Sequence, residues 1–140
     1  MIGMDILQPV VALLAWTMVM WVWMYATRIP AIMAARMVLD PTAPRGVQMA
    51  QLPARVRWKA DNYNHLLEQP VLFYATALAL ALLGDHSAIS IWLAWSYVGL
   101  RVVHSLWQAT RNLIVIRFVL FSISSLVLFA LAIRAALQVF

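Results

Sequence analysis

Four long apolar runs, separated by polar segments, set the pattern of this chain. They occupy roughly residues 6–27, 64–84, 87–108 and 112–134. A helix needs about 20 apolar residues to cross the ~30 Å hydrocarbon core of a bilayer, and each run is close to that length. The pattern therefore predicts an all-α membrane protein with a single four-helix transmembrane domain over residues 1–140. The first run lacks a basic leading segment and a small-residue cleavage site, so it is interpreted as a retained helix.

The connections between the runs predict how the helices are arranged. Only "GDHS" (residues 84–87) joins the second run to the third, and only "ATRN" (residues 109–112) joins the third to the fourth. Such short turns favour antiparallel neighbours, and thus an up-down bundle. The long connection, residues 28–60, contains "DPTAPRG" and is expected to be a polar loop.

Composition supports the membrane assignment and orients the chain. Hydrophobic residues make up 65% of the sequence and charged residues 11%, against about 25% charged residues in soluble domains. The basic residues form no stripe with interleaved aromatics, so the net charge of +5 does not indicate nucleic-acid binding. Most of them lie in segments 28–60 and 109–112, which the positive-inside rule places in the cytoplasm. Both termini should then face the other side, where Arg134 is the only Lys or Arg.

Three charged residues stand inside the apolar runs, namely Glu68, Arg101 and Arg117. A charge at bilayer depth costs at least ~2.5–3.5 kcal/mol on insertion scales, so each requires a reason. At ~1.5 Å rise per residue they lie roughly 6, 10 and 7 Å from the cytoplasmic ends of their helices. All three are therefore expected at nearly one level.

Helical spacing extends these charges into two polar faces. Residues three and four apart share a helix face, which groups Asp61, Asn64 and Glu68 on the second helix and Arg101, His104 and Gln108 on the third. We expect the two faces to meet or to border a common cavity.

Two interpretations of this level remain open. Glu68 and Arg101 could form an ion pair that only holds two helices in register. However, one glutamate cannot neutralise two arginines, so Arg117 calls for a further anion, either a ligand or a carboxylate from another subunit. No Gly-rich phosphate loop or metal-binding motif accompanies them, and no metal site is expected because the three histidines are dispersed. His65 is expected at the membrane interface, without a ligand role.

Three stretches carry a family resemblance that covers most of the chain: "NHLLEQPVLF", "RVVH" in the third helix, and an arginine sixteen positions after Arg101, in "IRF". With four spans, they resemble the MAPEG superfamily, membrane-associated proteins in eicosanoid and glutathione metabolism, in a bacterial-type form. The resemblance implies a homotrimer in the bacterial inner membrane. It also implies that glutathione binds at subunit interfaces near the cytoplasmic side.

The resemblance further implies roles for individual residues. Asn64 and Glu68 would contact the peptide, with Glu68 taking its ammonium group, while Arg101, His104 and Gln108 would line the pocket. Arg28 is a candidate for a glutathione carboxylate. Arg117 matches the arginine thought to stabilise the thiolate, a role that makes physical sense because a nearby cation lowers a thiol pKa. The thiolate would attack a lipophilic substrate dissolved in the bilayer.

The chain departs from the family pattern in three ways. Gln108 stands where many members carry a tyrosine, and Asn64 precedes Glu68 by four residues instead of three. The arginines usually found just before the asparagine are reduced to basic residues at 55, 57 and 59.

Three functions are therefore considered. The first is a glutathione transferase or peroxidase. The second is a non-catalytic membrane protein with this fold and a structural, assembly or lipid-binding role. A small transporter is a third, which no inverted repeat or broken helix supports.

Overall fold

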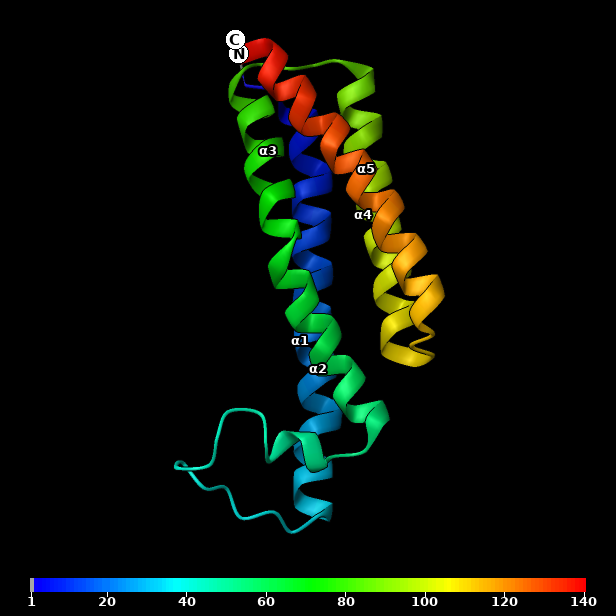
Figure 1. Cartoon of the computed structure of the whole chain (residues 1–140). Helices are drawn as coiled ribbons and strands as arrows, with labels where there is room; N and C mark the ends of the chain where they lie inside the picture. Colours follow the sequence, from blue (N-terminus) through cyan, green and yellow to red (C-terminus); the bar gives the residue numbers. More distant parts are fainter. Residues whose placement is uncertain (1) are drawn as a thin grey trace.

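The structure, a computed structural model, describes residues 2–140 and is all-helical over that range. Five helices follow one another along the chain: α1 (Leu7–Ala34), α2 (Ala54–Glu68), α3 (Pro70–Leu82), α4 (Ala88–Thr110) and α5 (Ile114–Val139). Two short 3-10 turns, η1 (Met4–Ile6) and η2 (Met49–Gln51), precede α1 and α2. Because α3 continues along the direction of α2, the chain forms four helical rods, and its two ends lie together near the α3–α4 turn (Figure 1).

The four rods differ in how well they suit a bilayer. Three stretches are long and apolar enough to cross a membrane: Met4–Ala34, Ala54–Leu82 and Ile114–Val139. The fourth rod, α4, has 23 residues but is more polar, because its buried face includes Arg101, His104 and Gln108. It packs against α5, α2 and α1. The all-helical prediction is confirmed, and both α4 and the α2–α3 rod contact each of the other rods.

The long connection is shorter than the predicted loop over residues 28–60. Helix α1 continues through Pro30 to Ala34, and α2 already begins at Ala54. Proline at an internal helix position removes one hydrogen bond, and here the helix continues past it. Arg36 ends α1 instead: it takes a left-handed conformation with φ of 48°, while the Met37 amide bonds to the Ile32 carbonyl at 3.2 Å. This is the usual geometry of a helix stop, but without the glycine that normally marks it.

A single proline divides the second rod. Pro70 follows Gln69, where α2 gives way to α3. Proline has no amide hydrogen, so the ladder of helical hydrogen bonds is interrupted there. The backbone of Gln69 nevertheless stays helical, with φ of −63° and ψ of −38°. The rod therefore continues, and the side chain of Gln69 lies where the ladder is broken.

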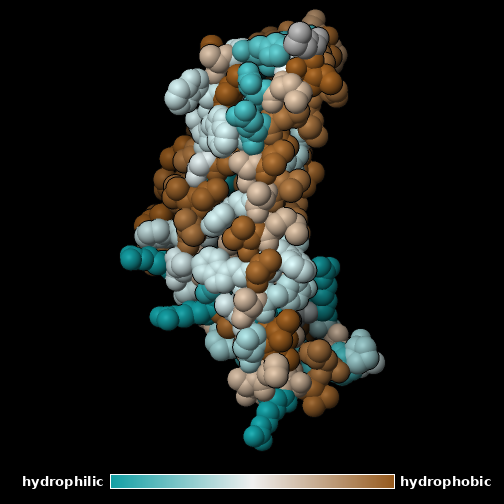
Figure 2. All heavy atoms as spheres, turned by 180° about the vertical axis from the view of Figure 1, so that it is seen from behind, coloured by the Kyte–Doolittle hydropathy of each residue, from teal (hydrophilic) through white to brown (hydrophobic). Residues whose placement is uncertain are grey.

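The outer surface of the rods is largely apolar. On α5 only Ser124, Leu128 and Leu131 are buried, whereas Phe129 is 68% exposed. Figure 2 shows apolar residues over much of the upper part of the molecule, while hydrophilic side chains project mainly from the lower half. This distribution fits lipid around the rods and water around the basic loop at one end.

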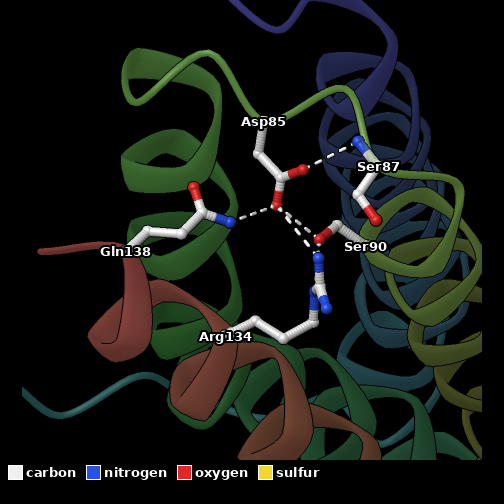
Figure 3. A network of polar contacts seen from close by, with 5 residues as sticks. All are labelled: Asp85, Ser87, Ser90, Arg134 and Gln138. Atoms are coloured by element: carbon white, nitrogen blue, oxygen red, sulfur yellow. Dashed lines mark hydrogen bonds and ion pairs between the residues drawn. The ribbon is translucent and has the colours of Figure 1, made fainter.

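At the opposite end, a polar network around Asp85 ties the α3–α4 turn to α5 (Figure 3). We call this set the Asp85 network; its members are Asp85, Ser87, Ser90, Arg134 and Gln138. The buried carboxylate accepts hydrogen bonds from the Ser90 hydroxyl at 2.5 Å and the Gln138 amide at 2.8 Å. Arg134 lies 3.8 Å from the same carboxylate. The network fastens the C-terminal part of α5 to the start of α4.

Candidate functional site

Arg101 is the most deeply buried charge in the molecule. Its side chain projects from α4 and has 0% exposure. Its Nη2 donates to Nδ1 of His65 at 2.7 Å and also lies 3.4 Å from the carbonyl oxygen of His65. Because a guanidinium can only donate, the imidazole nitrogen must be the acceptor in this contact. Arg101 is thus paired with a neutral ring on α2 and not with a carboxylate.

His65 is therefore held inside the molecule by other side chains, a contact that the sequence analysis did not predict. Its ring stacks on that of His104 with centroids 5.0 Å apart, and it meets the edge of Phe121 at 5.4 Å. The two histidines are neighbours, although nearly forty positions separate them in the chain. Residues 2–140 contain no group of three metal-binding side chains around this pair or elsewhere.

Arg117 reaches the same region from α5. Its Nη1 donates to the side-chain oxygen of Asn112 at 2.5 Å. Asn112 has a left-handed backbone, with φ of 53°, which asparagine tolerates better than most residues. It therefore forms the α4–α5 turn and also anchors the arginine one turn into the next helix.

These side chains border a small cavity. It has a volume of about 170 Å³ and is lined by His65, His104, Ile114, Arg117, Phe118 and Phe121. We call it the imidazole cavity, and we call its ionisable neighbours His65, Arg101, His104 and Arg117 the inner cluster. Ile114 and Phe118 are also exposed on the outer surface of α5. The cavity therefore lies between a polar interior and the side of the molecule that faces lipid.

Several buried polar atoms in this region have no hydrogen-bond partner among residues 2–140. They are Arg101 Nε and Nη1, Arg117 Nε, both ring nitrogens of His104, Asn62 Oδ1, Trp107 Nε1 and Gln108 Oε1. Buried polar groups are normally bonded, because leaving one unsatisfied costs about 1–3 kcal/mol. So many unsatisfied groups in one region, most of them on arginine or imidazole, indicate that something else completes their contacts.

The predicted polar face of the second helix points away from this cluster. Asp61, Asn64 and Glu68 are all exposed, whereas Arg101, His104 and Gln108 are buried. The expectation that the two faces meet within one chain is therefore wrong. The α2–α3 rod instead packs Leu66 and Phe73 into the apolar core. This rotation of the helix also brings the side chain of His65 into contact with α4.

Two other polar residues on the inward side of this rod, Asn62 and Gln69, form hydrogen bonds to neighbouring helices. Ser105 accepts hydrogen bonds from Asn62 at 2.6 Å and from Trp16 at 2.9 Å. Gln69, at the proline break, accepts from Tyr97 at 3.2 Å and donates to Ser125 at 2.8 Å. Sequence reasoning missed Asn62, His65 and Gln69, although their spacing of three and four residues marks one helix face.

The ion-pair interpretation of Glu68 and Arg101 is also wrong for the single chain. Among residues 2–140, the ion pair that forms is Asp85 with Arg134, at the other end of the molecule. Glu68 is exposed, and it takes part in no side-chain hydrogen bond with another described residue. No carboxylate among residues 2–140 is therefore in contact with Arg101 or Arg117.

Arg28 and Asn64 lie together at a second, larger cavity. It measures about 440 Å³ and lies between the end of α1, the loop with η2, and α2. Arg28, Arg45, Arg57, Asp61 and Asn64 are its polar lining residues. We call it the arginine cavity. Arg28 Nε is buried there without a partner among the described residues.

The site therefore consists of fixed donors around two basic cavities. The inner cluster supplies guanidinium and imidazole groups from three helices. Such groups favour a carboxylate, a thiolate or another anion, and they do so more strongly in a poorly hydrated site than in water.

Comparison with known proteins gives the family. A family model described as "MAPEG family" matches residues 6–137. No curated protein matches the chain, and no solved structure does. The matched range covers nearly all of the four rods and includes every residue of the inner cluster. The apolar helices and this match together show that the protein is an integral membrane protein that belongs to the MAPEG family.

Proposed function

We propose that the protein is a glutathione-dependent transferase or peroxidase that acts on lipophilic electrophiles in the membrane. The observation that carries this proposal is the uncompensated positive charge of the inner cluster. Arg101 and Arg117 have buried N–H groups without acceptors, and among residues 2–140 no carboxylate pairs with either of them. Buried charges are normally paired, so an anionic ligand is the natural partner.

The residues present fit glutathione. A peptide with two carboxylates, one ammonium group and one thiol can use both the unpaired arginine donors and the unpaired acidic group on α2. Arg28 and Asn64 would bind it at the arginine cavity, Glu68 would take the ammonium group, and Arg101, His104 and Gln108 would complete the pocket. When bound, the peptide supplies a thiol as the nucleophile.

Arg117 is the residue we assign to thiol activation. A cation close to a thiol lowers its pKa and increases the fraction of thiolate at neutral pH. Asn112 holds one edge of the guanidinium, so its position is fixed before any ligand arrives. Fixed donors stabilise a developing anion without having to reorganise.

The same reasoning supports assembly as a homotrimer, the state that the family resemblance implies. Asp61, Asn64 and Glu68 are exposed on one face of α2, while the donors that lack acceptors are on α4 and α5. A neighbouring subunit packed against this face would let residues of two chains share one ligand. We place the protein in a bacterial inner membrane, with the loop between α1 and α2 in the cytoplasm and both termini outside.

The test uses the full-length protein in detergent, with glutathione binding followed by calorimetry and conjugation followed with a model aryl halide. We expect Arg117→Ala to bind glutathione within a few-fold of wild type but to lose turnover by about tenfold to hundredfold, since a nearby charge shifts a pKa by about 1–3 units. Arg55→Ala is the matched control, because Arg55 is exposed and lines neither cavity. No binding at millimolar glutathione would reject the proposal.

The arginine cavity favours a second candidate, a non-catalytic member with a structural, assembly or lipid-binding role. Its lining carries three arginines against one aspartate, next to the point where α1 leaves the apolar region. Such a cavity suits the phosphate of an anionic lipid. In that case Arg117→Ala would change stability or assembly, wild type would show no thiol turnover, and anionic lipid would bind in place of glutathione.

A further inference from the structure

The ring of His65 is held by three contacts from two other helices. Its Nδ1 accepts from Arg101 of α4 at 2.7 Å. One face stacks on His104, also from α4, and the edge contact comes from Phe121 of α5. A side chain with this many contacts has one orientation before any ligand binds.

Arg101 also decides where the proton of His65 resides. A neutral imidazole has one donor nitrogen and one acceptor nitrogen, and a guanidinium always donates. Since Nδ1 accepts from Arg101, the proton must be on Nε2. Protonation of Nδ1 would break this bond and place a second positive charge against the buried guanidinium.

The remaining nitrogen, Nε2, is not sealed off by the protein. It has no hydrogen-bond partner among residues 2–140, yet it is not among the sealed polar atoms, unlike both nitrogens of His104. The ring of His65 lines the imidazole cavity, and Arg117 lines it as well. The cavity thus has one neutral N–H donor from α2 and one cation from α5.

We infer that His65 is a positioning residue whose Nε2–H donates to the anionic sulfur of a thiol bound next to Arg117. This inference rests on the proposed function and extends it. The cavity volume of about 170 Å³ suits a single reacting group and not a whole tripeptide, since sites for small molecules usually measure about 300–1,000 Å³. Arg101 acts through His65, because it fixes the tautomer and the plane of the ring.

Two substitutions separate the two nitrogens of His65. In His65→Asn, the side-chain oxygen is placed near the former Nδ1 and can still accept from Arg101, but the donor toward the cavity is lost. In His65→Gln, the longer amide can place an N–H group near the former Nε2. His86→Asn is the matched control, because His86 is exposed in the α3–α4 turn.

The first measurement is the ultraviolet absorbance of bound glutathione thiolate as a function of pH, in the full-length protein. We expect His65→Asn to lower the thiolate fraction at neutral pH by about tenfold, the size of one hydrogen bond to a charged group. His65→Gln should recover most of this loss, and His86→Asn should match wild type. Affinity for S-methylglutathione, which has no ionisable thiol, should stay within about threefold in all three variants.

The second measurement is nitrogen NMR of the protein labelled with nitrogen-15 at its three histidines. The signal lost in His65→Asn identifies His65. Its pattern should be that of the neutral Nε2–H tautomer, and the Nε2 signal should shift when glutathione is added but not when S-methylglutathione is added.

The outcomes distinguish this inference from the function on which it rests. An unchanged thiolate fraction in His65→Asn, an Nδ1–H tautomer, or equal loss of S-methylglutathione binding in the Asn and Gln variants would overturn the role of His65 while glutathione binding by wild type stands. If wild type binds neither peptide, the proposed function falls and the sulfur contact with it.

Discussion

Single residues in this protein often serve local structure and the site at once. Asn112 provides the left-handed turn between α4 and α5, and its side chain also anchors Arg117. Ser105 accepts from both α1 and α2 and lies next to His104 on α4. Because the rods are thin and closely packed, a residue near a turn or a crossing point contacts several elements, so its substitution affects both folding and chemistry.

Gly3 gives a test at this scale. A Cβ atom at this position would lie 2.6 Å from the backbone carbonyl oxygen of Asp85, which cannot move without the turn. We expect Gly3→Ala to destabilise the protein by about 1–3 kcal/mol, as overpacking against a fixed neighbour does. Unfolding by SDS titration in mixed micelles measures the effect.

Gly99 is the control for this substitution. A Cβ there meets nothing within 4 Å, and it lies inside α4, where alanine is preferred to glycine by roughly 0.5–1 kcal/mol. Gly99→Ala should therefore be neutral or slightly stabilising in the same assay. Equal losses in the two variants would contradict the close approach at Gly3.

At the scale of elements, the second rod shows how the rotation of a helix about its axis decides which of its polar residues face the site. Its polar residues divide between an outward face with Asn64 and Glu68 and an inward set with Asn62, His65 and Gln69. The inward set shares its side with Leu66 and Phe73, whose burial fixes the rotation of the helix. The apolar residues thus determine which polar residues reach α4.

The Asp85 network, which joins the α3–α4 turn to α5, allows a prediction about stability. Burial alone raises the pKa of the Asp85 carboxyl, but the hydrogen bonds it accepts, foremost from Ser90, and the charge of Arg134 hold that pKa below the usual 3.8. We expect Asp85→Asn to reduce the free energy of unfolding by about 1–3 kcal/mol at neutral pH, since it removes contacts to a buried charge.

The sign of the pH dependence follows from the lowered pKa. The carboxylate stabilises the folded state above its unfolded pKa, and this contribution is lost as pH falls through the lower folded value. The stability gap between wild type and Asp85→Asn should therefore be constant at neutral pH and close below about pH 4. Asp5→Asn, at an exposed position without a side-chain hydrogen bond to another described residue, should leave stability unchanged, and a gap that widens in acid would contradict the assignment.

Around an apolar core, the whole molecule also buries several polar groups and exposes many large apolar ones. Arg101 and Tyr97 are fully buried, while large apolar residues of α1 and α5 are exposed. This arrangement suits lipid, which solvates apolar side chains but leaves a charge costly unless the protein surrounds it. The two ends also differ: the basic loop is at one end, and the ion-paired Asp85 network is at the other.

Orientation in the membrane is the prediction at this scale. The chain has no cysteine, so one introduced thiol reports one position. We expect Thr42→Cys, in the basic loop, to react with a membrane-impermeant maleimide only in inverted vesicles. His86→Cys should react only from the outside of spheroplasts, because segments rich in Lys and Arg stay in the cytoplasm. The reverse pattern would show that the ends are exchanged.

Much of the fold was available from local properties of the sequence. The apolar runs, the two short turns and the charges at one level each depend on residues close together in the chain, and the all-helical fold followed from them. The end of α1 was missed, because Pro30 does not stop the helix and Arg36 stops it without a glycine. The start of α2 at Ala54 was also missed, since its first turns are polar and lie outside the apolar run.

The sequence by itself therefore determined a helical membrane protein with buried basic residues. Only the tertiary structure decided which residues surround them. It placed His65 against Arg101, turned Glu68 outward, and joined Asp85 to Arg134. The physical reason is that the rotation of each helix is set by packing against its neighbours, and a rotation of one residue exchanges the histidine for the asparagine beside it.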